Sequence, residues 1–207
     1  MLASKIAKKY KKQECVVIAL DDGGVIVGAQ IGYKLQSALM LLLSDEIKLP
    51  LEPEALAGIT SEGDFAYNSK YSAGEIDELA GEYRGLIEQE KLTSMHALNR
   101  LVSGGSVLNR KLLKDKVVIL VSEGLKSSFS IDVALAYLKV IDLKRLVIAT
   151  PLASVKVVDR MHVAADEIYC LSVVDDFIST NHYYDQNDIP DHEVIIKTLQ
   201  DFIKNWK

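Results

Sequence analysis

Residues Lys116–Lys139, KVVILVSEGLKSSFSIDVALAYLK, form the stretch around which the rest of the chain is organised. It opens with the apolar run Val117–Val121, which is typical of a fully buried strand. The polar loop Ser122–Ser130 follows, and then a helical pattern that carries Asp132 in its first turn. Because the N-terminus of a helix offers free backbone N–H groups and a positive dipole end, this unit predicts a binding site for a phosphate-sized anion.

A similar unit lies near the start of the chain. The apolar run Cys15–Leu20 predicts a strand that stops at the loop Asp21–Gly24. A helix is expected from about Val25 to Ser37, and a second strand over Leu39–Leu43. A strand, a helix and a strand in this order form a βαβ unit, so we expect the two strands to lie parallel in one sheet.

The second half of the chain continues this alternation. We expect a strand over Arg145–Thr150, ended by Pro151, then a helix over Ser154–Ala164 and a strand over Glu167–Ser172. The pattern predicts an α/β fold, an open and mainly parallel sheet with helices on both faces. A final amphipathic helix is expected to begin near Asp188. Its expected buried residues are Val194, Ile195, Leu199, Phe202 and Trp206.

Residues 44–71 depart from the alternation and are interpreted as a small hood added to a single domain, 1–207. Prolines and glycines punctuate this segment, which predicts a hairpin or an irregular structure around Ala57–Thr60 and Phe65–Tyr67.

Residues 72–112 are expected to add a long helix and a flexible loop. Ser72 and Glu75 have the spacing of a capping box, and apolar residues continue at helical period to Leu92 or beyond. The segment Ser103–Ser106, SGGS, is expected to form the tip of the loop.

Composition limits the classes of function. The chain has 207 residues, 49% of them hydrophobic, which is enough for a substantial core. Its net charge of −5 disfavours nucleic-acid and anionic-membrane partners. No apolar run approaches the ~20 residues of a membrane span, and the first residues lack the apolar core of a signal peptide. We therefore expect a cytoplasmic protein.

Two further features of the sequence are interpreted as structural and not as binding sites. The first is a run of N-terminal lysines, expected to form the solvated face of a short helix over residues 2–12. These lysines are Lys5, Lys8, Lys9, Lys11 and Lys12. The second is the pair Cys15 and Cys170, both in apolar runs and interpreted as buried thiols of a reducing compartment.

The sequence lacks several familiar catalytic signatures. It has no P-loop and no dinucleotide-binding fingerprint after either candidate strand. The four histidines are scattered and are interpreted as surface or capping residues, and no metal ligands are predicted. What remains is the pair of loops Asp21–Gly24 and Ser122–Ser130, because ligands of open parallel sheets bind at the carboxyl ends of strands near a topological switch.

Each loop also has a purely structural interpretation. Asp21 and Asp22 with Gly23 and Gly24 could form a tight turn with an aspartate cap, and the serines of the second loop could cap a helix. Taken together, the loops favour a shared anion site.

These residues resemble the type I phosphoribosyltransferase superfamily, in particular its branch of predicted bacterial phosphoribosyltransferases with a long helical insertion. Members of that branch carry P-R-G-G-V after the first strand, where this chain has Asp21–Val25. They carry V-D-D-G-[IL]-A-T-G-A-T after the central strand, where this chain has Val121–Ser130. Their tail, W-Y-x-D-F and then D-E-E-V, is similar to Tyr183–Gln186 and Asp191–Val194.

The resemblance implies a role for each loop. In the superfamily the central loop binds the 5′-phosphate of phosphoribosyl pyrophosphate (PRPP), two preceding acidic residues hold the ribose hydroxyls, and the first loop contacts the pyrophosphate. A Mg²⁺ ion bridges pyrophosphate and ribose oxygens, so Mg²⁺ is expected here only together with PRPP. Carried over, the catalytic positions are Ser122 and Glu123. The ligand-binding positions are Asp21, Asp22, Gly23, Gly24, Lys126, Ser127, Ser128, Phe129 and Ser130.

Both loops depart from the family pattern. Glu123 keeps the second acidic position, and Ser127 and Ser130 keep the hydroxyls of the two threonines, but Ser122 replaces the first acid. Ser128 and Phe129 stand at the loop glycine and its neighbour. Asp22 replaces the arginine of the pyrophosphate loop, and Lys126 replaces a small residue.

The replacement at Asp22 has the largest expected effect. Two like charges ~4 Å apart at an effective dielectric near 20 repel by about 4 kcal/mol, roughly three decades in rate.

Three hypotheses follow. The chain binds a phosphoribosyl or nucleotide-type ligand with lost or altered transferase activity; or it is an active PRPP-dependent transferase of nucleotide salvage; or it is a non-catalytic oligomeric scaffold or regulatory protein, with a homodimer as the commonest closed assembly.

Overall fold

The structure is a computed structural model that describes residues 1–102, 108–186 and 188–204. It contains two compact units. The first comprises Met1–Leu42, Gly105–Ser127 and Ile141–Lys207, and the second comprises Leu43–Gly104 and Ser128–Val140. The second unit therefore combines the expected hood and most of the helical insertion with a helix from the central strand–loop–helix stretch.

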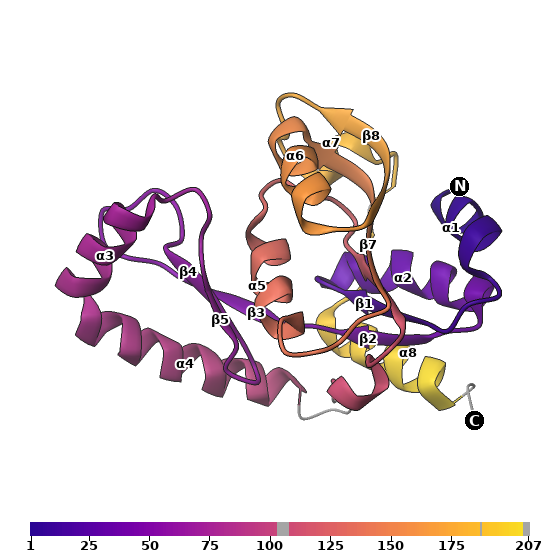
Figure 1. The fold of residues 1–207 in the computed structure, drawn as a ribbon, viewed down its shortest axis with the longest axis horizontal. Helices are drawn as coiled ribbons and strands as arrows, with labels where there is room; N and C mark the ends of the chain where they lie inside the picture. The colour runs from indigo at the N-terminus through magenta and orange to yellow at the C-terminus, as the bar shows by residue number, and fades with distance from the viewer. Residues whose placement is uncertain (103–107, 187, 205–207) are drawn as a thin grey trace. The chain divides into compact units, whose positions relative to one another are not determined.

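The first unit is built on a five-stranded parallel sheet (Figure 1). Its strands are β1 (Cys15–Ala19), β2 (Ala38–Leu41), β6 (Val117–Val121), β7 (Arg145–Ser154) and β8 (Glu167–Val174). They lie in the order β2-β1-β6-β7-β8, and every neighbouring pair is parallel. All residues of β1 and β6 are buried, as their continuous apolar sequences predict. The expected parallel α/β sheet is confirmed.

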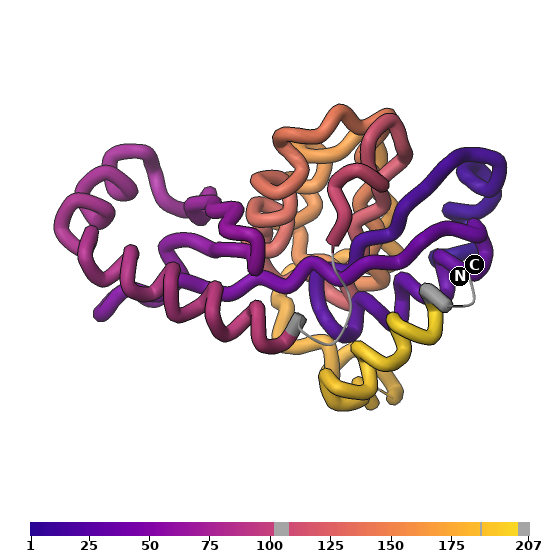
Figure 2. Tube along the Cα trace, turned by 90° about the horizontal axis from the view of Figure 1, so that it is seen from below, coloured from indigo at the N-terminus to yellow at the C-terminus, as the bar shows by residue number. Residues whose placement is uncertain are grey.

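Helices flank this sheet on both faces. The helices of this unit are α1 (Leu2–Tyr10), α2 (Asp22–Leu35), α6 (Val155–Ala164), the short α7 (Thr180–Tyr183) after β8 and α8 (His192–Lys204), with the 3₁₀ helix η1 (Arg110–Leu112) before β6. The chain crosses from β1 to β2 in one direction and from β7 to β8 in the other. Right-handed crossovers therefore place α2 and α6 on opposite faces. Helix α8 packs against α2 and β2, and Figure 2 shows α8 beside α2.

Several expected boundaries in this unit differ from the structure. Helix α2 begins at Asp22 and not near Val25, so Asp22, Gly23 and Gly24 form its first turn. Strand β7 does not end at Pro151 but continues to Ser154, because β8 pairs with Thr150 and then with Leu152 and skips the proline, which has no N–H to donate.

The last helix begins at His192, not near Asp188. Three of its expected core residues, Ile195, Leu199 and Phe202, are buried, whereas Val194 is half exposed. Trp206 lies outside the described residues.

The second unit contains a three-stranded antiparallel sheet. Its strands β3 (Ser44–Ile47), β4 (Ala57–Thr60) and β5 (Phe65–Tyr67) lie in this order. The hairpin of β4 and β5 has the predicted bounds, and its register pairs Gly58 with Ala66. Strand β3 was not expected, since its polar sequence SDEI gives only one fully buried residue, Ile47.

Two helices cover opposite faces of this small sheet. Because side chains alternate along a strand, Ala57 and Ile59 of β4 point to one face, where they pack with Met95 of α4 (Arg84–Val102). Gly58 points to the other face, toward Phe129 of α5 (Phe129–Leu138).

The expected long helix from Ser72 is interrupted. The chain forms α3 (Ala73–Glu82) and then α4, with Tyr83 between them at φ −103°, ψ 21°. The capping box of Ser72 and Glu75 is confirmed. The predicted loop tip Ser103–Ser106 lies outside the described residues. None of the helices that the structure describes is long and apolar enough to cross a membrane.

Candidate functional site

The two loops singled out in the sequence meet in the first unit, at the point where the strand order reverses. Strands β1 and β6 are neighbours in the middle of the sheet, with Ala19 opposite Val121. The chain leaves β1 toward β2 on one side and leaves β6 toward β7 on the other, so the gap between them is the topological switch point. Just beyond the ladder, the Leu20 N–H donates to the Val121 carbonyl at 2.8 Å.

The first loop is a tight entry into α2. Asp21 is its N-cap, and its Oδ1 accepts a hydrogen bond from the Gly24 N–H at 2.5 Å. Its two glycines are needed for close approach. A Cβ on Gly23 would lie 2.1 Å from Glu123 Oε2, and one on Gly24 would lie 2.7 Å from the Val121 carbonyl oxygen. Thus the two loops are in van der Waals contact through positions that no larger residue could occupy unchanged.

Ser122 connects the loops by hydrogen bonds. Its side chain is buried, and its Oγ donates to Asp21 Oδ2 at 2.5 Å. The same oxygen accepts from the Gly124 N–H at 3.2 Å. The Ser122 hydroxyl is therefore engaged within the protein.

The carboxyls of Asp21 and Glu123 lie in a partly desolvated environment. Burial raises the pKa of Asp21, while hydrogen bonds from Ser122 and from the backbone of Gly24 and Glu123 lower it. Burial also raises the pKa of Glu123; a hydrogen bond with Thr180 opposes this shift and the charge of Asp21 adds to it. Both carboxyls are therefore easier to protonate than exposed ones.

The residue that sequence reasoning missed is His192. Its Nδ1 lies 2.9 Å and 3.0 Å from the two carboxylate oxygens of Asp22. Its Nε2 is buried, with no hydrogen-bond partner among the residues that the structure describes. The contact of this histidine with Asp22 was not predicted; it arises because α8 packs on α2 and brings its first residue to the first residue of α2.

The segment between β8 and α8 covers the second loop. The Tyr184 hydroxyl donates to the Glu123 carbonyl at 2.8 Å. Burial, together with the charges of Glu123 and Asp21, raises the pKa of Tyr184 to about 12. A Cβ on Gly124 would lie 2.4 Å from Thr180 Cγ2 and 3.1 Å from the Phe177 ring. Glu123 and Gly124 therefore lie beneath side chains of the tail.

The later part of the second loop is pinned to β7. Leu125 forms a parallel bridge with Ala153, and its N–H donates to the Leu152 carbonyl at 2.9 Å. The Lys126 carbonyl accepts from Ser154 Oγ at 3.2 Å, while the Lys126 side chain is exposed. Lys126 and Ser127 thus follow a fixed backbone segment, and a cation is available to an incoming anion there.

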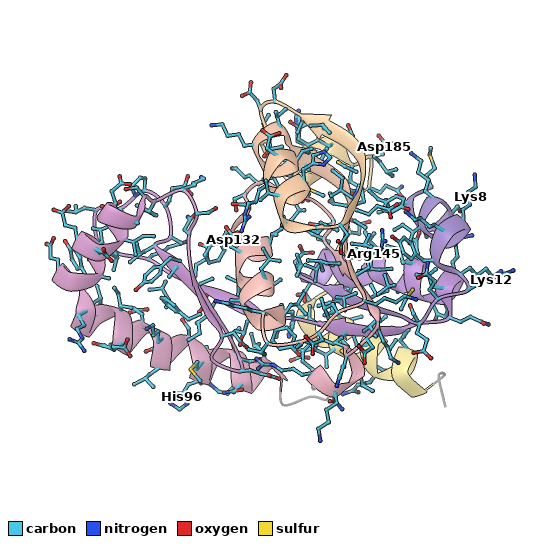
Figure 3. All side chains as sticks on the ribbon, in the orientation of Figure 1. Lys8, Lys12, His96, Asp132, Arg145 and Asp185 are labelled. Carbon is cyan, nitrogen blue, oxygen red and sulfur yellow. The ribbon has the colours of Figure 1, made fainter. Side chains whose placement is uncertain are left out.

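The remaining predicted site residues belong to the second unit. Ser128 is the N-cap residue of α5, and its Oγ donates to Asp132 Oδ2 at 3.3 Å. Ser69 Oγ donates to the same carboxylate oxygen at 2.8 Å; Asp132 is labelled in Figure 3. Phe129 is buried in an apolar cluster with Ala55 and Val133, so its side chain is a core residue of this unit. Ser130 is half-buried in the first turn of α5.

The first unit thus brings together six of the predicted residues and adds three from the tail. The six are Asp21, Asp22, Gly23, Gly24, Ser122 and Glu123, and the three are Thr180, Tyr184 and His192. Among the described residues, no group of three or more His, Cys, Asp or Glu side chains is arranged to hold a metal ion. The site therefore contains the carboxyl groups of Asp21, Asp22 and Glu123, and the imidazole of His192 lies beside Asp22.

Comparison with known proteins supports the fold. No family model matches the chain. Two proteins from strains of Mycobacterium tuberculosis, each named "Putative phosphoribosyl transferase", are 24% identical over 190 residues, which is 88% of this chain. The chain spans only 40% of the length of these relatives.

Among solved structures, TT1426 from Thermus thermophilus superposes with a TM-score of 0.73 and 24% identity, covering 97% of this chain and 93% of that one. A hypoxanthine phosphoribosyltransferase from Staphylococcus aureus superposes with a TM-score of 0.49 and 11% identity, covering 85% of this chain and 71% of that one.

Proposed function

We propose that the chain, which is similar to phosphoribosyltransferases in sequence and fold, binds a phosphoribosyl or nucleotide-type ligand, with a transferase activity that is lost or altered. The observation that carries the proposal is the meeting of two loops, Asp21–Gly24 and Ser122–Ser127, at the switch point of the sheet.

The state of Ser122 supports loss or change of the activity. In the superfamily the two acids of the central loop hold the ribose hydroxyls. Here the first acid is a serine whose hydroxyl is buried and already bonded to Asp21 and Gly124. Glu123, the second acid, lies against Gly23 and beneath the tail. A ribose would have to compete with these internal contacts, which costs binding free energy.

His192 supports the alternative of an active transferase. The expected repulsion between Asp22 and a pyrophosphate group assumes an unpaired carboxylate. When His192 is protonated, its positive charge lies beside Asp22 and the pair has no net charge. A bound anion would then lie beside a neutral pair, although the arginine of the family pattern would still be absent.

Mg²⁺ is proposed to bind only together with PRPP. Asp21 is already bonded to Ser122 and to the Gly24 N–H, and Asp22 to His192, so their oxygens are not preset as a protein cage for a metal. Mg²⁺ favours one or two carboxylates plus phosphate oxygens over such cages, which fits a metal carried by the ligand. Bound there, it would neutralise pyrophosphate charge.

The experiment that separates the alternatives measures pyrophosphate release from PRPP and Mg²⁺ with a panel of nucleobases. We expect turnover at least three decades below an ordinary enzyme value of about 10 s⁻¹. Turnover near 1 s⁻¹ that disappears in Glu123→Ala would contradict lost activity and establish the active transferase. The third hypothesis, a scaffold, predicts no PRPP binding together with a stable homo-oligomer in sedimentation.

A further inference from the structure

A cavity of about 500 Å³ lies at the amino-terminal ends of strands β1, β2 and β6 in the first unit. It is bordered by the end of α1, the end of α2 and the residues just before β6. Its lining residues are Lys11, Lys12, Gln13, Glu14, Cys15, Val16, Leu35, Gln36, Ser37, Ala38, Leu112 and Lys116. The volume is in the range of small-ligand sites, about 300–1,000 Å³. Because the phosphoribosyltransferase-like loops follow the opposite ends of the strands, this cavity is not part of that site.

The charge of the lining is predominantly positive. Lys11, Lys12 and Lys116 line the cavity, and the single acid, Glu14, lies 3.8 Å from the Lys116 ammonium. Burial raises the pKa of the Cys15 thiol to about 11, so it adds no negative charge at neutral pH. Helices α1 and α2 both end here, and each C-terminus contributes roughly half a negative charge. The three ammonium groups outweigh these contributions, leaving about one positive charge.

Ser37 is an independent sign of an absent partner. It lines the cavity with only 4% of its surface exposed, and its Oγ has no hydrogen-bond partner within the described part of the chain. Buried hydroxyls are normally hydrogen-bonded, so one without a partner is unfavourable and calls for an explanation. An oxygen of a bound ligand would accept a hydrogen bond from this hydroxyl.

The backbone around the cavity is ordered by tertiary hydrogen bonds. The Val117 N–H donates to the Glu14 carbonyl at 3.0 Å, and the Ser37 N–H donates to the Gly32 carbonyl at 3.1 Å. Gln36 holds the left-handed conformation, φ 54° and ψ 53°, that turns the chain from α2 into β2. The lining is therefore attached to fixed elements, not to a free chain end.

From the volume, the three lysines and the unpartnered hydroxyl, we propose that this cavity is a second anion site, which takes a small soluble phosphate-bearing molecule. Lys11, Lys12 and Lys116 supply the charge, the amides of Gln13 and Gln36 supply neutral donors, and Ser37 supplies a buried donor. The site does not depend on the function proposed for the loops.

The test follows backbone amide signals by NMR while inorganic pyrophosphate is added to ¹⁵N-labelled protein. Saturable shifts are expected at Lys11–Glu14, Gln36–Ala38 and Lys116. In the same spectra, signals of Asp21–Gly24 and Ser122–Ser127 report binding at the other site, so the two proposals are tested independently.

Matched variants distinguish specific binding of pyrophosphate in the cavity from its general electrostatic attraction to surface lysines. Lys12→Glu is expected to weaken pyrophosphate binding at the cavity roughly tenfold, and Ser37→Ala several-fold without any change of charge. The control is Lys8→Glu, which makes the same charge change at an exposed α1 residue outside the lining; Figure 3 labels both lysines. An absence of shifts at millimolar pyrophosphate, or equal losses in the Lys8 and Lys12 variants, would overturn the proposal.

Discussion

Asp22 and His192 show how one contact between distant residues changes the interpretation of a sequence. By sequence alone, Asp22 is a carboxylate where the loop motif that this chain resembles has an arginine. In the structure His192 Nδ1 lies within 3.0 Å of both of its oxygens. The two residues are 170 positions apart, and nothing in the local sequence of either predicts the other. Only the packing of α8 on α2 brings them together.

This pair leads to a double-mutant prediction. His192→Ala is expected to weaken PRPP binding roughly tenfold, because it leaves the Asp22 carboxylate near the ligand without its hydrogen-bond partner. Adding Asp22→Asn is expected to restore most of the loss, because it removes that carboxylate. Calorimetric titration of the four proteins of the cycle measures the coupling directly.

The matched control for this cycle is Asp185→Asn, which removes one exposed carboxylate and should leave the affinity unchanged. If His192→Ala binds PRPP as tightly as the original protein, His192 has no role at the site.

At the scale of elements, the sequence predicted most of the fold and little of the site. The buried strand Val117–Val121 and the hairpin of Ala57–Thr60 and Phe65–Tyr67 have their expected bounds, because continuous burial and turn residues are local signals. Long-range strand pairing accounts for one difference, because β7 runs through Pro151 where β8 skips that residue. The break between α3 and α4 at Tyr83 was not predicted, since the apolar residues continue at helical period through it.

The site residues show the same limit. The glycines of the first loop and the acid at Glu123 were identified from their neighbours along the chain. The engagement of Ser122 with Asp21, and the cover that Thr180 and Tyr184 provide, required the folded chain. By sequence, Phe129 belongs to the predicted anion-binding loop, whereas in the structure its side chain is buried in an apolar cluster.

A prediction for the second unit concerns Gly58 of β4. A Cβ there would lie 2.3 Å from the Phe129 ring and 2.5 Å from Val133 Cγ2, so Gly58→Ala overpacks the contact between α5 and the small sheet. We expect a loss of about 1–3 kcal/mol in the free energy of unfolding, measured by urea denaturation.

Gly81→Ala provides the control for Gly58→Ala. It lies in α3 with no atom within 4 Å of the added Cβ, so it should stabilise by about 0.5–1 kcal/mol through helix propensity. Equal effects of the two substitutions would refute the packing of α5 on β4.

At the scale of the whole molecule, a charged cluster ties α1 to the edge of the parallel sheet. Glu167 of β8 accepts hydrogen bonds from Lys9 Nζ and the Tyr10 hydroxyl, both at 2.5 Å, and from the Tyr169 hydroxyl at 2.6 Å. Partial burial raises the pKa of Glu167, but these bonds outweigh it and lower the pKa to about 2.

This shift predicts an acid-dependent stability. Because the folded pKa lies below the unfolded value, Glu167 stabilises the fold above about pH 4.5, and the contribution is lost as the pH falls toward 2. With Lys9 half exposed, we expect Glu167→Gln to lose about 1–2 kcal/mol at pH 7 and little at pH 2, measured by urea unfolding across pH. The exposed Glu78→Gln should show no such dependence; a constant deficit of Glu167→Gln at all pH values would contradict the account.

Calorimetric titration with PRPP tests whether the loops at the switch point bind a phosphoribosyl or nucleotide-type ligand. The purified protein is titrated with and without Mg²⁺, beside Glu123→Gln and the control Asp185→Asn. We predict micromolar binding that the Glu123 variant weakens at least tenfold and the control does not. No heat from PRPP or from nucleotides at millimolar concentration, with the protein folded, would contradict the claim.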